Sequence, residues 1–100
     1  MWKIDATTLV PDVPDSKENF DPDWCAFRNK VWNKIDEMVK LGKTDGERHY
    51  SPMVINPDGT TLIKITRYFI DETSAREYSD WVQENKPINS TYEITVEEIY

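Results

Sequence analysis

The stretch from Asn56 to Trp81 constrains the fold more than any other part of the chain. It opens with Asn56-Pro57-Asp58-Gly59, in which proline supplies a φ of about −65° and glycine accepts a positive φ, as a type I turn closing a β-hairpin requires. Residues 60–70 then alternate in polarity and are rich in β-branched and aromatic side chains, which is typical of a strand. The segments on either side of the turn should therefore pair as neighbouring strands.

A helix is predicted directly after this strand. Asp71 has a carboxylate that can accept a hydrogen bond from the backbone N–H of Thr73 or Ser74, which is the role of an N-cap residue. The helix should end at Lys86-Pro87. Its apolar side chains recur every three or four residues and form one stripe, made of Ala75, Tyr78, Trp81 and Val82.

The N-terminal half predicts a strand, a loop and a helix. Residues 2–9 alternate between apolar and polar side chains, as a half-buried strand does. Residues 10–20 contain two prolines among polar residues and predict a loop. A broad apolar stripe predicts a helix from Pro22 to Leu41, with Asp21 as its cap and Gly42 at its end.

The remaining two elements are strands. Residues 48–55 should form the first hairpin strand, at a sheet edge because Pro52 has no N–H to donate, and residues 91–97 alternate as a strand with one solvated face. The order strand, helix, strand, strand, helix, strand resembles the ferredoxin-like split βαβ sandwich. That resemblance implies an α+β fold, with two helices on one face of a four-stranded antiparallel sheet of spatial order 4-1-3-2. One hundred residues fit a single domain, 1–100.

The turn also predicts which side chains face the core, because a three-residue turn at 57–59 sets the hairpin register and the side-chain period of a strand is two. The predicted opposite pairs are Met53 with Ile63, Ser51 with Ile65, and His49 with Arg67. The predicted buried face is Met53, Ile55, Ile63, Ile65, Phe69, Trp2, Ile4, Ala6, Tyr92, Ile94 and Val96. The predicted open face is Lys3, Asp5, Thr7, Arg48, Tyr50, Lys64, Thr66, Tyr68, Thr91, Glu93, Thr95 and Glu97.

This open face is the main candidate for function. Tyr50 and Tyr68, ringed by threonine and charged residues, fit a protein-docking patch, a homodimer face or a base-stacking platform, and they also fit ordinary strand formers. Acidic Glu93 and Glu97 on the same sheet argue against base stacking. The residues predicted to bind a partner are Arg48, Tyr50, Lys64, Thr66, Tyr68, Glu93, Thr95 and Glu97.

The charge of the chain narrows its partners. A formal charge of −7 and a pI near 4.6 argue against direct binding to nucleic acid or to an anionic membrane, which need clustered lysine and arginine. Residues 71–100 hold eight acidic and two basic side chains, whereas residues 24–70 hold five acidic and eight basic ones. The first helix should therefore pair with the second through Arg28, Lys30 and Lys34 facing Glu77, Asp80 and Glu84.

No catalytic, cofactor or metal signature emerges. His49 beside Arg67 reads either as an anion or carboxylate site or as a polar rim at the end of the core. One histidine and one cysteine do not make a zinc site, which needs about four such ligands. Cys25 falls in an apolar helix stripe and excludes an internal disulfide. The sequence has no leader-like N-terminus and no long apolar run, so we expect a cytoplasmic protein. Because no cofactor-binding motif is present, we expect no cofactor.

The segment TRYFIDETSAREYSDWV, residues 66–82, resembles a strand–turn–helix segment of small uncharacterised proteins of tailed bacteriophages, through Arg67, Phe69, Asp71, Ala75, Tyr78 and Trp81. The resemblance implies a phage-encoded accessory protein in the host cytoplasm, either a host-directed or anti-defence inhibitor or a minor virion or regulatory component. It implies no enzymatic activity.

The hypothesis that follows is a small acidic, non-enzymatic binding protein that occupies the surface of a protein partner, one that is basic or handles nucleic acid. Two alternatives stay open. One is a small-molecule enzyme of the dimeric α/β-barrel type, which needs a pocket between helices and sheet lined by groups such as His49 and Arg67. The other is a minor structural subunit of a virion.

Overall fold

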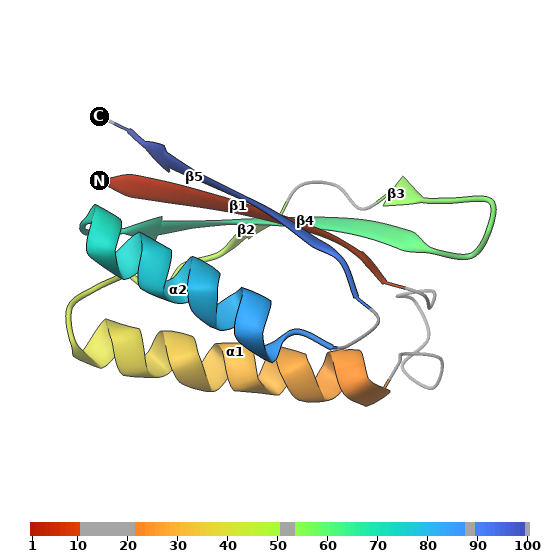
Figure 1. Cartoon of the computed structure of the whole chain (residues 1–100), viewed down its shortest axis with the longest axis horizontal. Coiled ribbons are helices and arrows are strands. Elements are labelled where there is room, and N and C mark those ends of the chain that lie inside the picture. The colour runs from red at the N-terminus through yellow and green to blue at the C-terminus, as the bar shows by residue number, and fades with distance from the viewer. Residues whose placement is uncertain (11–21, 51–53, 88–89, 100) are drawn as a thin grey trace.

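The computed structural model describes residues 1–10, 22–50, 54–87 and 90–99, with the side chains of Val10, Pro22 and Ile55 left out. It is an α+β sandwich in which two helices lie side by side on one face of an antiparallel sheet (Figure 1). Neither helix is long and apolar enough to cross a membrane. The elements are β1 (Trp2–Val10), α1 (Pro22–Lys40), β2 (His49–Tyr50), β3 (Val54–Ile55), β4 (Thr61–Phe69), α2 (Glu72–Asn85) and β5 (Tyr92–Glu98).

The strand order identifies the fold. β1 lies in the middle, antiparallel to β4 on one side and to β5 on the other, with Trp2 opposite both Phe69 and Glu98. β2 and β3 both pair with β4 and complete the order β2-β4-β1-β5. Because β2 and β3 lie within the single hairpin strand predicted at 48–55, this is the predicted 4-1-3-2 order, and the ferredoxin-like fold is confirmed.

The turn and the helix cap form as predicted. The backbone N–H of Gly59 donates to the carbonyl of Asn56 at 3.1 Å, and Gly59 has a φ of +88° that a side chain would disfavour. Helix α2 begins after Asp71, whose carboxylate accepts from the N–H of Ser74 at 2.7 Å. Both features depend on local chemistry, and both lie in the segment that most constrains the fold.

The core lies between the sheet and the two helices. Burying each large apolar side chain there stabilises the fold by about 1.5–3 kcal/mol before the entropy of ordering is counted. The inward-facing positions predicted for β1 and β4 are confirmed at Ile4, Ile63 and Phe69, and Ile65 is half-buried. The buried cluster is Ile4, Phe27, Ile35, Met38, Phe69, Ala75, Tyr78 and Val82.

The predicted register of the hairpin is right beside the turn and wrong farther along. Val54 lies opposite Leu62, as a three-residue turn requires, but Tyr50 lies opposite Ile65, one residue short of the predicted register. One extra residue in one strand produces such a shift, and the sequence between the two segments contains Pro52, which cannot donate to a ladder. The expectations for Ser51 and Met53 lie outside the described residues.

This shift reverses the predicted faces of the edge strand. Tyr50 and Arg48, both expected on the open face, lie on the helix side, where the Arg48 guanidinium is 5.3 Å from the ring centre of Trp32. His49, expected opposite Arg67, pairs with Thr66 on the open face instead. A change of one residue moves every following side chain to the other face, because alternate residues point in opposite directions.

The seam between the helices carries one of the predicted ion pairs. Glu77 of α2 lies 3.9 Å from Lys34 of α1 and 3.0 Å from Lys43, which follows α1 in the chain. All three side chains are partly exposed, so each pair contributes at most about 1 kcal/mol. The pairs set how α2 aligns with the end of α1 more than they stabilise the fold.

Candidate functional site

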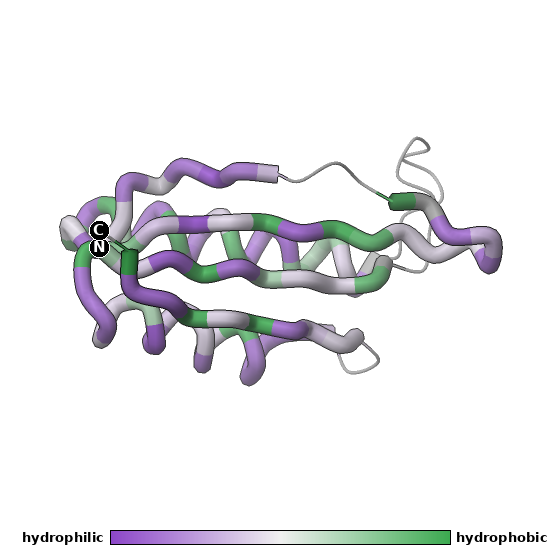
Figure 2. The backbone as a smooth tube through the Cα atoms, turned by 90° about the horizontal axis from the view of Figure 1, so that it is seen from above, coloured by the Kyte–Doolittle hydropathy of each residue, from purple (hydrophilic) through white to green (hydrophobic). Residues whose placement is uncertain are grey.

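The open face of the sheet carries most of the residues predicted to bind a partner. Viewed from above, the sheet lies in front of both helices (Figure 2). No helix among the described residues covers the face of the sheet that is turned toward the viewer. β4 and β5 are joined through β1, so their outward side chains share one surface. The structure brings together there Lys64, Thr66, Tyr68, Glu93, Thr95 and Glu97, and it separates Arg48 and Tyr50 from them.

A polar cluster occupies one end of this face. Lys3 Nζ lies 3.4 Å from Asp5 and 3.6 Å from Glu97, and the Thr66 hydroxyl donates to Asp5. Asp5 raises the pKa of Lys3. Burial alone would raise the pKa of Asp5, but the Thr66 hydrogen bond, with Lys3 and Lys64 nearby, outweighs burial and lowers it. Lys3 and Asp5 therefore both stay ionised at neutral pH.

The other end of the open face is apolar, which the sequence analysis missed. Leu9 pairs with Leu62, and Leu62 pairs with Val54, so three aliphatic residues form a row across β1, β4 and β3. Leu9 is 48% exposed and Val54 51%. The signal was available in part, because both leucines occupy outward positions of their strands, but the row requires the pairing of three separate segments. We call Leu9, Leu62 and Val54 the aliphatic row.

An acidic margin borders this face. β5 is an edge strand, with β1 on one side and no described strand on the other. Glu93 and Glu97 of β5 are on the open side, and Glu98, opposite Trp2, is on the helix side. All three are exposed, and such charges protect an edge from unwanted pairing. Asp80 and Glu84 of the neighbouring α2 are exposed as well.

The predicted pairing of His49 with Arg67 is wrong. His49 is exposed on the open face, where its ring lies 5.5 Å from the ring of Tyr68 at an angle of 73°. Arg67 points to the opposite face and is buried, with 4% of its surface exposed. The two side chains are separated by the sheet and cannot form one site.

Arg67 instead lies inside the layer between sheet and helices. Its guanidinium carbon is 5.9 Å from the ring centre of Tyr78, a cation–π contact, and its Nε has no hydrogen-bond partner. Among the described residues no carboxylate lies within 4.0 Å of the guanidinium. Removing an unpaired charge from water costs several kcal/mol. The desolvation of Arg67 at this position therefore opposes folding.

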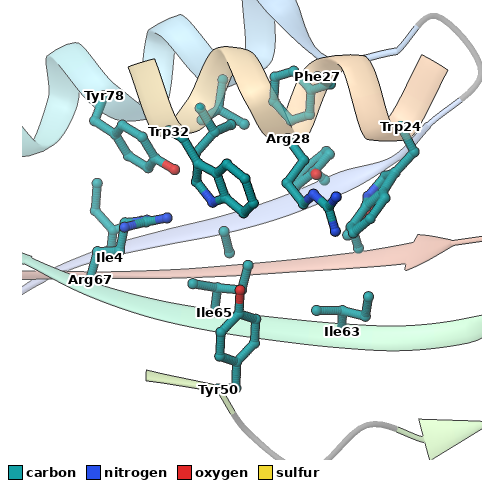
Figure 3. Close-up of a pocket in the computed structure, with 15 residues that line it drawn as sticks. Ile4, Trp24, Phe27, Arg28, Trp32, Tyr50, Ile63, Ile65, Arg67 and Tyr78 are labelled. Carbon is teal, nitrogen blue, oxygen red and sulfur yellow. The ribbon is translucent and has the colours of Figure 1, made fainter. Parts of the chain in front are cut away.

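Arg67 lines a cavity between α1 and the sheet, drawn in Figure 3. The cavity holds about 60 Å³, and most of its wall is apolar. Arg28 of α1 also reaches it, with its guanidinium carbon 5.0 Å from the ring centre of Trp32 and 5.5 Å from that of Trp24. The aromatic residues of the wall are Trp24, Phe27, Trp32, Tyr50, Tyr78 and Tyr92.

The phenols of buried Tyr78 and partly buried Tyr92 at this cavity are held neutral. Burial raises the pKa of Tyr92 to about 12. Burial also raises the pKa of Tyr78, although the charge of Arg67 and a hydrogen bond from it act in the opposite direction. Neither tyrosine therefore supplies the negative charge that Arg67 lacks.

Comparisons with known proteins support the fold. No protein-family model matches the chain, and no curated protein matches it. Among solved structures, a de novo designed protein, Foldit4, is similar with a TM-score of 0.58 at 12% identity, covering 99% of this chain and 98% of that one. A second designed protein, LFR1 1, which has a ferredoxin fold, has a TM-score of 0.46 at 14% identity, covering 98% of this chain and 85% of that one. The likeness to Foldit4 concerns the fold alone.

Proposed function

We propose that this protein is a non-enzymatic binding protein whose open sheet face docks against a basic surface of a protein partner. The observation that carries the proposal is the composition of that face, which has an exposed aliphatic row at one end, a polar cluster at the other end and an acidic margin along β5. Protein interfaces commonly combine apolar and polar surface.

The negative charge of the chain favours a partner with a basic surface. Glu93, Glu97 and Glu98 line the free edge of the sheet, and the chain as a whole carries −7. A basic partner surface would be attracted to this margin, and its approach would be faster at low salt. Resemblance to tailed-phage accessory proteins supports a host protein as the partner, which would make the chain a host-directed or anti-defence inhibitor.

The test uses tagged protein to capture partners from a bacterial lysate, with a face variant and a matched control. The face variant is Leu9→Ser with Glu93→Lys, and the control is Leu41→Ser with Glu37→Lys, which makes the same two substitutions at exposed positions in α1 and directly after it. We expect that some lysate proteins are captured by the wild type and by the control but not by the face variant. Added salt should release these proteins from the wild type. Equal capture by the face variant and wild type, or no protein specific to wild type and control, would contradict the proposal.

If the protein self-associates through the open face, that face is a homodimer interface and not a docking site for another protein. Analytical ultracentrifugation of wild type and face variant separates the two cases: a dimer that the face variant dissolves would give the open face to a second copy of the chain, as in dimeric α/β barrels. A monomer at all concentrations leaves the face to a different protein.

A further inference from the structure

The layer between α1 and the sheet offers a second site, on the side of the sheet opposite the docking face. We propose that it binds a small monocarboxylate with a short apolar tail, with the carboxylate on Arg67 and the tail in the aromatic-lined cavity (Figure 3). This site is independent of the protein-docking function proposed above.

The first step is the position of Arg67 between two spaces. On one side it lines the partly enclosed apolar cavity of about 60 Å³. On the other side Arg67 and Trp32 both line an open cleft of about 370 Å³, whose wall also includes Arg48. A ligand entering through the cleft would therefore meet the guanidinium groups before its tail reached the apolar cavity.

The second step is the unbalanced charge. Arg67 is buried, its Nε is unpaired, and no carboxylate of the described residues lies within 4.0 Å of its guanidinium, although Asp36 lines the same open cleft. Arg28 Nε is likewise buried without a partner at the same cavity. Arg48 lies across the Trp32 ring, 5.3 Å from its centre. The guanidinium groups of Arg28 and Arg48 thus lie over the Trp32 ring, and Arg67 lines the cavity and the cleft that Trp32 also lines. An anion is the ligand that would compensate these positive charges.

The third step is the kind of anion. A guanidinium presents parallel N–H donors that match the two oxygens of a carboxylate. Asp36 also lines the open cleft, and it would repel a dianion more strongly than a monoanion. The partly enclosed cavity holds about 60 Å³ and is lined mainly by aromatic and aliphatic groups, so it selects a short apolar tail over a polar one.

Butyrate is the probe that tests the proposal, with butyramide as its uncharged match and inorganic phosphate as an anion without a tail. Binding is followed by the indole N–H resonances of Trp24 and Trp32 in ¹⁵N-labelled protein and by the melting temperature. We expect saturable shifts and a higher melting temperature with butyrate, and neither with butyramide or phosphate. An equal response to butyramide would overturn the role of charge, and an equal response to phosphate would overturn the role of the tail.

Arg67→Met is the decisive variant, because methionine keeps much of the stem and removes the charge. We expect it to fold, to melt at or above the wild-type temperature without ligand, and to bind butyrate at least about tenfold more weakly. Arg76→Met, which removes an exposed arginine of α2, is the control and should bind as wild type does. If Arg67→Met does not fold, Arg48→Met at the exposed side of the cleft takes its place with the same expectation of weaker binding. Unchanged butyrate affinity in the folded variant would overturn the proposal.

Discussion

The carboxylate of Asp71 accepts a hydrogen bond of 2.7 Å from the backbone N–H of Ser74 and so caps helix α2. This bond links the end of β4 to the start of the helix and satisfies an N–H that would otherwise lack a partner. The backbone and side chain of Ser74 both lower the pKa of Asp71.

Replacing this cap should weaken the fold. Asp71→Ala removes the acceptor, so we expect a melting temperature several degrees below wild type by circular dichroism. Asp71→Asn keeps an acceptor at the same position and is the matched control. A melting temperature of Asp71→Ala equal to that of the Asn variant would show that the cap does not stabilise α2.

The free energy of unfolding should depend on the size of the side chain at the buried C-terminal end of β4. Phe69 is 1% exposed and packs on Tyr78, with ring centres 5.3 Å apart, so Phe69→Ala should lower the free energy of unfolding by about 3–5 kcal/mol. Its neighbour Ile70 is 61% exposed, and Ile70→Ala should change stability by less than about 0.5 kcal/mol. Urea denaturation of both variants measures the contrast, and similar losses would contradict the assignment of the core face.

Asp5 should make the protein lose stability in acid. Its pKa in the folded protein lies below the ordinary value of 3.8, which the unfolded chain keeps. The ionised carboxylate therefore stabilises the fold fully above about pH 5, and this contribution is lost as the pH falls through 3.8 and then through the lower folded pKa. Asp5→Asn should be less stable than wild type at pH 7, and the gap should close on acidification. Asp80→Asn removes an exposed α2 carboxylate as a control, and a gap that stays constant with pH would contradict the prediction.

The helix seam should show weak, salt-dependent coupling. Lys43 Nζ donates to both oxygens of Glu77, at 3.0 and 3.3 Å. A double-mutant cycle with Lys43→Met and Glu77→Gln should give a coupling energy of about 0.2–1 kcal/mol, smaller in 1 M salt. The exposed pair Arg76 and Glu72 on α2 serves as the reference cycle. Coupling unaffected by salt would indicate packing instead of charge attraction.

Two glycines after α1 should differ in how much a substitution by alanine destabilises the fold. Gly42 and Gly46 have φ of +71° and +78°, so alanine is strained at either position. A Cβ at Gly46 would also lie 2.7 Å from Val39 Cγ2, whereas one at Gly42 meets nothing within 4 Å. Gly46→Ala should therefore lower the melting temperature more than Gly42→Ala does, and equal losses would show that the Val39 side chain moves aside without cost.

Local chemistry was enough to predict the elements and their order. Proline and glycine in a four-residue turn, aspartate before a helix, and apolar periods of two and 3.6 act over a few residues, so they can be read without knowing the fold. The helix bounds at Pro22 and Asn85 agree with the prediction to within a residue or two. The inward positions Ile63 and Phe69 followed from the same alternation.

Tertiary structure alone decided which side chains the edge strand β2 turns toward the helices and which residues of different strands become neighbours. A one-residue change of register between Val54 and Tyr50 turned Arg48 and Tyr50 toward the helices, and no local pattern specifies where such a shift occurs. The aliphatic row and the site of Arg67 each depend on residues from segments far apart in the chain. Long-range pairing sets these neighbours, because burial is a property of the packed layers and not of the residue's own sequence context.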